Sequence, residues 1–449
     1  MYQQKKIGSS EKDWVIIGLY SIIAIIGLVC IFSVEYRSND EVIKGFFGFK
    51  KNYSKQFFYL LSCIVIATFI LLTDSKFFTA TPNLFYLICI LLMIATFAIG
   101  KTVNGSKSWI PLGFMNLQPV ETCKIFTSLA LAKYLSQPDM DFSKTKSQLI
   151  ASAICFFPVV FSLLQNETGL ALVYFSFLLP MYREGFPPIY LIIGAFLGVL
   201  LVATLLLSSM QLVVGLTSIA ILTIYLLNRK IKRDKKILFS IISVWAISLL
   251  FSVVAVPFIF QHVFQKYQAD RIFSMVGRDN PYHNDNKTIT TIEITPPNKP
   301  KSDNENYNVK QSKIAIGSGG FFGKGFLKGT QTQGDFVPEQ HTDFIFTSLA
   351  ENFGFLGCTV LMALYLGLLL RIVFVAERQR STFSRVYAYS VAAIIFFHFA
   401  VNICMTIGLA PVIGITLPLM SYGGSSLLTF TVLIFILVRL DADRQMVLR

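Results

Sequence analysis

Apolar residues in this chain gather in long uninterrupted runs, and polar residues are largely confined to the stretches between them. A helical run of about 15 to 20 apolar residues is long enough to cross most of the hydrocarbon core of a bilayer. The runs predict about twelve membrane-spanning helices, at residues 14–34, 57–73, 84–99, 120–135, 150–164, 168–181, 189–207, 213–227, 237–259, 344–371, 386–409 and 427–438. The pattern therefore predicts an all-α, polytopic membrane protein.

Composition agrees with a chain that lies mostly in lipid. Apolar residues make up 54% and charged residues 14%, against roughly 25% charged residues in an ordinary globular domain. The net charge of +14 comes largely from Lys and Arg clusters near residues 5–6, 133–146, 228–236 and 371–385. These clusters share one side of the membrane if both termini are cytosolic and the number of spans is even. Anionic lipid head groups account for such cations, so we expect membrane contact and no nucleic-acid partner.

Cysteine and histidine are distributed in a way that predicts neither a metal site nor a disulfide framework. The seven cysteines lie in or at the ends of apolar runs, and the four histidines stand singly. Zinc sites and disulfide frameworks need such residues in pairs at characteristic spacing. We expect small buried thiols and isolated histidines.

Residues 260–341 form the longest polar segment, which the charge pattern places outside the cell membrane. Within it, residues 279–306 are rich in Asn, Asp, Thr, Lys and Pro and cannot bury enough apolar surface to order themselves. This composition predicts a mobile insertion at residues 282–306, after which order resumes. A helix is expected to begin near Thr342, with Thr342 or Asp343 as its N-cap.

Several ionisable residues fall within or between the predicted spans. Glu121 and Lys124 are three residues apart on one helix face, Glu167 lies in a short polar break, and Glu351 lies about two turns into a helix. Such residues in a membrane are functional hypotheses by default. A neutralising pair such as Glu121 and Lys124 is equally compatible with a structural role, and so is Glu351 in helix packing.

Residues 317–329, GSGGFFGKGFLKG, form a glycine-rich loop. The spacing fits neither the P-loop, which needs Gly-Lys-Ser/Thr, nor the dinucleotide-binding fingerprint. Its glycines permit positive φ angles and close backbone approach, and Lys313, Lys324 and Lys328 lie nearby. These features suit binding of a pyrophosphate; a flexible surface loop with solvated lysines is the alternative.

Five segments together resemble the SEDS family of peptidoglycan polymerases, and in particular its RodA branch. The resemblance covers most of the chain and is specific in combination. The segments are Trp109–Lys124 (WIPLGFMNLQPVETCK), Gln311–Gly320 (QSKIAIGSGG), Gly323–Gln333 (GKGFLKGTQTQ), Phe336–Phe346 (FVPEQHTDFIF) and Pro411–Ser426 (PVIGITLPLMSYGGSS).

The resemblance implies a SEDS-like helical bundle, with a family core of about ten spans and an extra hairpin between residues 189 and 259. It implies an inverting peptidoglycan glycosyltransferase that polymerises lipid II into glycan strands, releases undecaprenyl pyrophosphate, and serves cell elongation and shape. The implied location is the bacterial inner membrane. The implied partners are a class B penicillin-binding protein, which is a transpeptidase, and the elongation machinery.

The resemblance also implies which residues act. The family's catalytic aspartate precedes a proline in the outer loop, and Asp279 is the nearest match, with Asp303 and Asp285 as alternatives because the insertion interrupts this loop. A divalent cation, Mg²⁺ or Mn²⁺, would be an optional aid for holding the leaving pyrophosphate. The expected substrate-binding residues are Glu121, Lys124, Gln311, Ser312, Lys313, Gly319, Gly320, Lys324, His341, Thr342, Asp343, Ser421 and Tyr422.

The chain departs from the family at residues 165–170, where Gln-Asn-Glu-Thr-Gly-Leu keeps an acid but lacks the usual proline. Two other functions stay open. A transporter of lipid-linked precursors would share the polytopic shape, although we find no internal repeat of the kind common in transporters. A non-catalytic scaffold of the cell-wall machinery is the other alternative, because the catalytic loop is atypical.

Overall fold

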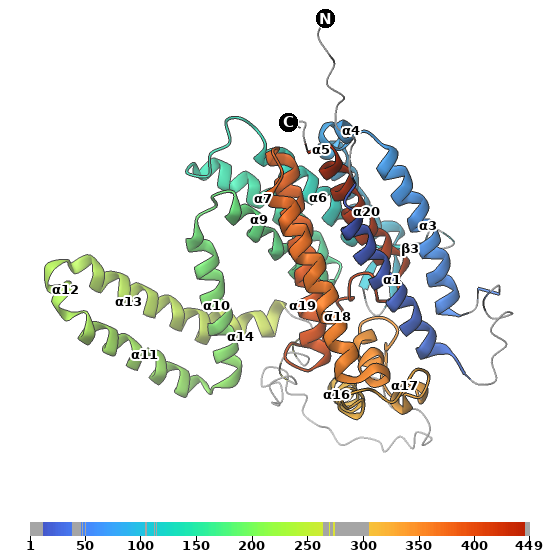
Figure 1. Cartoon of the computed structure of the whole chain (residues 1–449). Helices are drawn as coiled ribbons and strands as arrows, with labels where there is room; N and C mark the ends of the chain where they lie inside the picture. The colour runs from blue at the N-terminus through green and yellow to red at the C-terminus, as the bar shows by residue number, and fades with distance from the viewer. Residues whose placement is uncertain are drawn as a thin grey trace, which may run out of the picture. The chain divides into compact units, whose positions relative to one another are not determined.

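The computed structural model describes residues 12–37, 46, 48–49, 51–103, 106–111, 113, 115–263, 269, 273 and 305–444. It is mostly helical and divides into two compact units (Figure 1). Unit 1 comprises Met1–Phe186 and Asn308–Arg449, and unit 2 comprises Pro187–Tyr307.

Unit 1 is a helical bundle with one small sheet. The strands β1 (Lys101–Val103), β2 (Ser106–Pro111) and β3 (Asn116–Leu117) pair antiparallel in that order. The helices are α1 (Trp14–Glu35), α3 (Asn52–Leu72), α4 (Ser75–Ala80), α5 (Pro82–Ile99), α6 (Pro119–Leu135), α7 (Thr145–Leu164), α8 (Thr168–Val173), η1 (Tyr174–Phe177), α9 (Leu178–Arg183), α16 (Glu305–Ser318), α17 (Thr330–Gln333), α18 (Ile345–Glu377), α19 (Thr382–Thr406) and α20 (Gly424–Ala442).

Helix α6 lies at the centre of unit 1, where α5, α7, α19 and α20 pack against it. Side chains are buried all around it, including the polar ones of Glu121 and Lys124. Helices α19 and α20 are also largely enclosed, whereas α3 and α7 expose much of their apolar surface. A helix that is buried on every side can carry charged residues only if they find partners inside the protein.

Unit 2 consists of α10 (Pro188–Leu206), α11 (Ser209–Leu226), α12 (Asn228–Arg233), α13 (Lys235–Leu250), η2 (Phe251–Ala255), α14 (Val256–Phe258) and η3 (Ile259–Val263). Its long helices are apolar, yet only 6% to 11% of their most hydrophobic windows is buried. Apolar surface of this extent is typical of helices that face lipid. The basic helix α12 joins two of these long helices, as the charge pattern predicts for a loop at the membrane surface.

In the described part of the chain, ten helices are long and apolar enough to cross a membrane. The prediction of about twelve spans is not confirmed. The run at residues 120–135 forms α6, which has 17 residues, and the run at residues 168–181 is divided among α8, η1 and α9.

The predicted helix start near Thr342 is corrected. Helix α18 begins at Ile345, and its N-cap is Phe344, which makes no side-chain capping bond. The hydroxyl of Thr342 instead donates to Glu339 Oε2 at 2.9 Å. Helix α16 begins at Glu305, inside the stretch for which the composition predicted a mobile insertion.

Candidate functional site

The buried pair on α6 has a third partner. Lys124 Nζ lies 4.0 Å from Glu121 Oε1 and 2.8 Å from Nε2 of His398 on α19. The ring of Phe430 on α20 lies beneath the ammonium, 5.5 Å from Nζ to its centroid. All three polar residues are at most 3% exposed. The α6 pair is therefore part of a charged cluster that joins three helices.

The hydrogen bonds fix the protonation of His398. Its Nδ1 lies 3.2 Å from the carbonyl oxygen of Thr416, which can only accept a hydrogen bond. Nδ1 therefore carries the proton, and Nε2 presents its lone pair to the Lys124 ammonium. A neutral histidine thus connects the charge on α6 to the loop that leads into α20.

The loop of residues 410–423 covers this cluster and meets the segment that precedes α18. Asn402 Nδ2 donates to the carbonyl oxygens of Asp343 and Ile415 at 2.8 and 2.7 Å. Gly169, at the start of α8, approaches the same loop so closely that an added Cβ would lie 2.1 Å from the carbonyl oxygen of Ile413. Glycine is therefore required at this position in the segment that departs from the family pattern.

Four predicted substrate-binding residues do come together at this loop. Ser421 Oγ donates to the carbonyl oxygen of Thr342 at 2.7 Å, and the backbone nitrogen of Tyr422 donates to that of His341 at 2.9 Å. The rings of His341 and Tyr422 lie 5.7 Å apart. Burial and the neighbouring Tyr59 raise the pKa of Tyr422 above its ordinary value, so the phenol keeps its proton at neutral pH. Together with Asp343, these residues form a polar surface at one end of unit 1.

The glycine-rich loop fills a break in α18. Gly354 has φ 63° and ψ −159°, which interrupts the helix. The carbonyl oxygens of Glu351 and Asn352, freed by the break, accept hydrogen bonds from the loop nitrogens of Lys324 and Gly325, each at 3.0 Å. The loop thus replaces the hydrogen bonds that the helix loses.

The exchange is reciprocal. The nitrogens of Phe355 and Leu356 donate to the carbonyl oxygens of Gly320 and Phe321 at 2.9 and 3.0 Å. An added Cβ on Gly319 would lie 2.1 Å from the carbonyl oxygen of Ala350, on the same helix. The glycines therefore permit the close approach that was predicted. The loop makes this approach to α18, where it stabilises the fold.

The Glu351 carboxylate accepts several of the hydrogen bonds in this region. It is 0% exposed and accepts hydrogen bonds from Lys324 Nζ at 2.8 Å, the backbone nitrogen of Gln331 at 2.8 Å, and the nitrogen and hydroxyl of Thr332 at 2.8 and 2.6 Å. Lys324 also donates to Thr330 Oγ1 at 2.7 Å. In this structure the partly exposed Lys324 ammonium is paired with the Glu351 carboxylate within the protein.

The predicted residues on α16 play different parts. Ser312 is buried and donates to the carbonyl oxygen of Thr406 at 2.8 Å, and its hydroxyl also lies 2.8 Å from Thr347 Oγ1. Lys313 is exposed, and its side chain passes over Gly408. A Cβ added to Gly408 would lie 2.5 Å from Lys313 Nζ. Gln311 is half-buried beside them. Ser312 therefore anchors the helix, and Lys313 is a predicted cation that solvent reaches.

Asp279, Asp285 and Asp303 lie outside the described residues, so their positions relative to this surface remain a prediction from sequence. One residue of the cluster on α6 was not predicted from sequence. His398 was expected to be an isolated histidine, although its place within an apolar run indicates a buried polar partner.

The opposite end of unit 1 contains a network of ion pairs. Asp13, which caps α1, accepts from Arg371 and Arg378 at 2.8 and 2.9 Å, and the buried Asp441 accepts from Arg378 as well. Burial alone would raise the pKa of Asp13, but the hydrogen bond from Arg371 and the nearby positive charges lower it below its ordinary value. This network ties together the ends of α1, α18 and α20.

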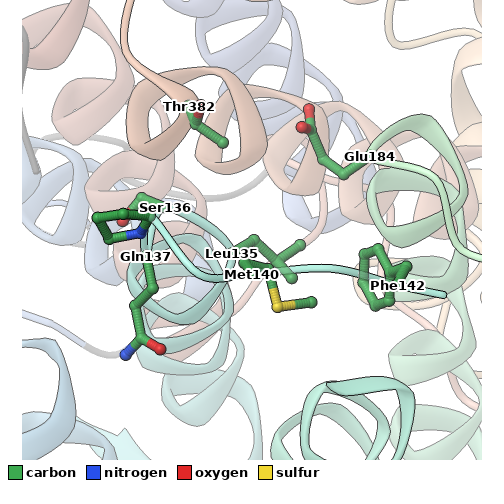
Figure 2. A pocket seen from close by; sticks show the side chains of 8 residues that line it. Leu135, Ser136, Gln137, Met140, Phe142, Glu184 and Thr382 are labelled. Carbon is green, nitrogen blue, oxygen red and sulfur yellow. The ribbon is translucent and has the colours of Figure 1, made fainter. Parts of the chain in front are cut away.

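A pocket of about 390 Å³ opens at the same end, where α6 and α9 finish and α19 begins (Figure 2). Glu184, on its wall, forms a two-pronged ion pair with Arg385, with both N–O distances 2.8 Å. The pocket lies at the C-terminal end of α6, whereas Glu121 and Lys124 lie near its N-terminus. It is lined by Leu135, Ser136, Gln137, Pro138, Met140, Phe142, Glu184 and Thr382.

In the part of the chain that the structure describes, no group of three or more His, Cys, Asp or Glu residues is arranged to hold a metal ion. The seven cysteines are free, and five of them are buried.

Comparison with known proteins identifies relatives along nearly the whole chain. The family model of the FtsW/RodA/SpoVE cell cycle proteins matches residues 13–227 and 236–446. Peptidoglycan glycosyltransferase MrdB of Escherichia coli K12 is 31% identical over 364 residues, which are 80% of this chain and 78% of that protein. Peptidoglycan glycosyltransferase RodA of Treponema pallidum is 30% identical over 452 residues, covering 97% and 98%.

Solved structures show the same fold. A chain from a peptidoglycan synthase complex, in a study of coordinated polymerization and crosslinking, superposes with a TM-score of 0.67 at 21% identity and covers 96% of this chain and 98% of its own. The rod shape determining protein RodA of Thermus thermophilus gives a TM-score of 0.60 at 21% identity and covers 97% and 98%.

Proposed function

The chain belongs to the FtsW/RodA/SpoVE family of cell cycle proteins, and we propose that it is a peptidoglycan glycosyltransferase of the RodA type, which polymerises lipid II. It is a multi-pass membrane protein. The observation that carries the proposal is the convergence of family-matched segments that are far apart in sequence. His341–Asp343, residues 410–423 and the charged cluster on α6 are joined by direct hydrogen bonds.

The proposed reaction is a displacement with inversion. The 4-hydroxyl oxygen of one sugar attacks the anomeric carbon of another, a new glycosidic bond forms, and the bond from that carbon to the lipid pyrophosphate oxygen breaks. The hydroxyl proton passes to a carboxylate on the face opposite the leaving group, as in inverting glycosidases. We assign this base to Asp279, with Asp303 and Asp285 as alternatives.

The leaving pyrophosphate takes the electron pair of the broken bond and needs positive charge rather than a proton. Lys313 is exposed on α16 and is the cation best placed to reach a ligand. Lys124 is fully buried and already paired, so in this conformation it supports the site from within. Mg²⁺ or Mn²⁺ would add charge at the pyrophosphate, and chelation tests whether the reaction requires either ion.

Location and partners follow from the same proposal. A bacterial inner membrane, with both termini in the cytosol, puts the surface formed by His341–Asp343 on the outer side. A class B penicillin-binding protein would crosslink the strands that this chain makes, within the elongation machinery. The similarity in fold to a chain of a peptidoglycan synthase complex supports this partnership.

Purified protein in liposomes with fluorescent lipid II separates the proposal from its alternatives. The proposal expects glycan strands, and addition of the class B penicillin-binding protein should raise their yield. Movement of lipid II across the bilayer without strands would identify a transporter. Neither activity, with or without the partner, would identify a scaffold.

A further inference from the structure

A short strut connects the break in α18 to the proposed substrate-binding surface. We define the α17 strut as residues 329–340, which include α17 and end directly before His341. Glu351 holds its beginning: the carboxylate accepts the backbone nitrogens of Gln331 and Thr332. At Gly329 the backbone approaches so closely that an added Cβ would lie 2.6 Å from Glu351 Oε2.

The middle of the strut is tied to α1. Gln333 Nε2 donates to the carbonyl oxygen of Ser33 at 3.1 Å. Arg37, just beyond the end of α1, forms an ion pair with Asp335 at 2.7 Å. The strut is therefore held by two long helices, α1 and α18.

Gln340 holds the far end. Its side chain is 5% exposed, and Nε2 donates to the carbonyl oxygen of Thr332 at 3.1 Å and to Asp335 Oδ1 at 2.8 Å. The next residue, His341, accepts from the backbone of Tyr422. Hydrogen bonds, together with the backbone link from Gln340 to His341, thus connect Glu351 through the strut to the residues proposed to bind substrate.

We propose that Glu351 and Gln340 are positioning residues, which set the place of His341–Asp343 by way of the α17 strut without touching the substrate. This inference rests on the proposed function. The hydrogen bonds of the strut start at a buried carboxylate and end at the residue before the surface, so loss of either end should let His341–Asp343 shift. Displacements of about 1 Å can lower the rate of a positioned reaction by about 100-fold.

The chain supplies a matched control for Gln340. Gln379, just after α18, is also 5% exposed, and its Nε2 donates to one backbone carbonyl, that of Val375 at 3.2 Å, and to one carboxylate, Asp441 Oδ1 at 2.7 Å. In both sites an arginine remains on the carboxylate after the glutamine is lost. Asp441 is buried while Asp335 is 67% exposed, so loss of Gln379 should cost at least as much stability.

The experiment compares Gln340→Met with Gln379→Met in the full-length protein, since methionine keeps the length of the side chain. Lipid II polymerisation gives kcat/KM, and thermal unfolding in detergent gives Tm. We expect Gln340→Met to lower kcat/KM by about 10- to 100-fold and Gln379→Met to leave it within about twofold. The Tm of Gln340→Met should be no lower than that of Gln379→Met.

Glu351→Gln tests the other end of the strut. It should lower kcat/KM in the same way, and the double variant with Gln340→Met should fall less than the product of the two single effects, because both act through one path. If Gln340→Met does not fold, Asp335→Ala, at an exposed side chain, removes one of the two acceptors of Gln340 and should lower kcat/KM in the same direction.

Activities that fall in proportion to Tm in both glutamine variants would overturn the positioning role. If Gln340→Met does not fold, a folded Asp335→Ala protein with normal activity would overturn it as well. Fully multiplicative effects of Glu351→Gln and Gln340→Met would also overturn it. A wild-type protein that makes no strands would instead refute the proposed function, and this inference with it.

Discussion

Replacing Lys124 by Met should severely destabilise the protein, because two buried partners lose their only cation in the cluster. At 4.0 Å from Glu121, with an effective dielectric constant of about 20, the lost attraction is about 4 kcal/mol. This agrees with about 3–5 kcal/mol for breaking a buried pair. His398 Nε2 loses its donor as well, which costs about 1–3 kcal/mol. The expected loss is about 4–8 kcal/mol.

The double variant Glu121→Gln with Lys124→Met separates these contributions. Removing both charges should restore about 3–5 kcal/mol and leave the unpaired His398 nitrogen, about 1–3 kcal/mol. Thermal unfolding in detergent measures the order of stability, in which the double variant should lie between the wild type and Lys124→Met. A double variant no more stable than Lys124→Met would refute the electrostatic account of this cluster.

Activity of the double variant tests a separate point. Strand synthesis should remain low even where stability returns, because Lys124 is the donor that fixes His398 and, through Thr416, the loop beside His341–Asp343. Full recovery of the polymerisation rate would exclude a role for Lys124 in the reaction and leave a structural one.

Three further predictions address other parts of the chain. Asp279→Ala should lower strand synthesis by about 100- to 10,000-fold while lipid II still binds; a near-normal rate, together with loss in Asp303→Ala, would move the base to Asp303. Gly323→Ala should lower Tm more than Gly320→Ala. Both residues have positive φ, but only at position 323 would the added Cβ lie 2.2 Å from a carbonyl oxygen of α18. Equal Tm values would contradict the packing described for the loop. Asp13 has a folded pKa below its usual 3.8, so the stability that it gives the fold is complete above that value and is lost as the pH falls through the folded pKa. The free energy of unfolding measured below about pH 4 should therefore depend less on pH in Asp13→Asn than in the wild type. An unchanged pH dependence would show that Asp13 does not contribute.

Hydrophobic runs predicted the positions of most long helices well, because transfer of apolar side chains into lipid depends on composition more than on tertiary contacts. The count of about twelve is not confirmed where an apolar run is divided into short helices. Residues 168–181 are apolar enough, yet the chain is divided among α8, η1 and α9. Hydropathy reports burial, and not whether the buried segment is one straight helix.

The site was partly predictable for a different reason. Glu121 and Lys124 are neighbours on one helix, so their pairing follows from spacing, whereas His398 is 274 residues from Lys124, and only the packing of α6 against α19 brings them together. The glycines of the loop predicted a close backbone approach, but not which segment the loop approaches. The break in α18 at Gly354, against which the loop packs, becomes visible only in the folded structure. Capping of α18 by Thr342 or Asp343 was wrong because the helix begins later, at Ile345, so Phe344 occupies the N-cap position.

The most direct test of the proposed activity is the product balance of purified protein supplied with lipid II. Each new glycosidic bond between two lipid II units must release one undecaprenyl pyrophosphate, so the amount of released lipid pyrophosphate should equal the number of newly formed bonds. Asp279→Ala should suppress both together. Lipid II recovered unchanged, with neither strands nor free lipid pyrophosphate in the presence of the class B penicillin-binding protein, would contradict the assignment as a glycosyltransferase.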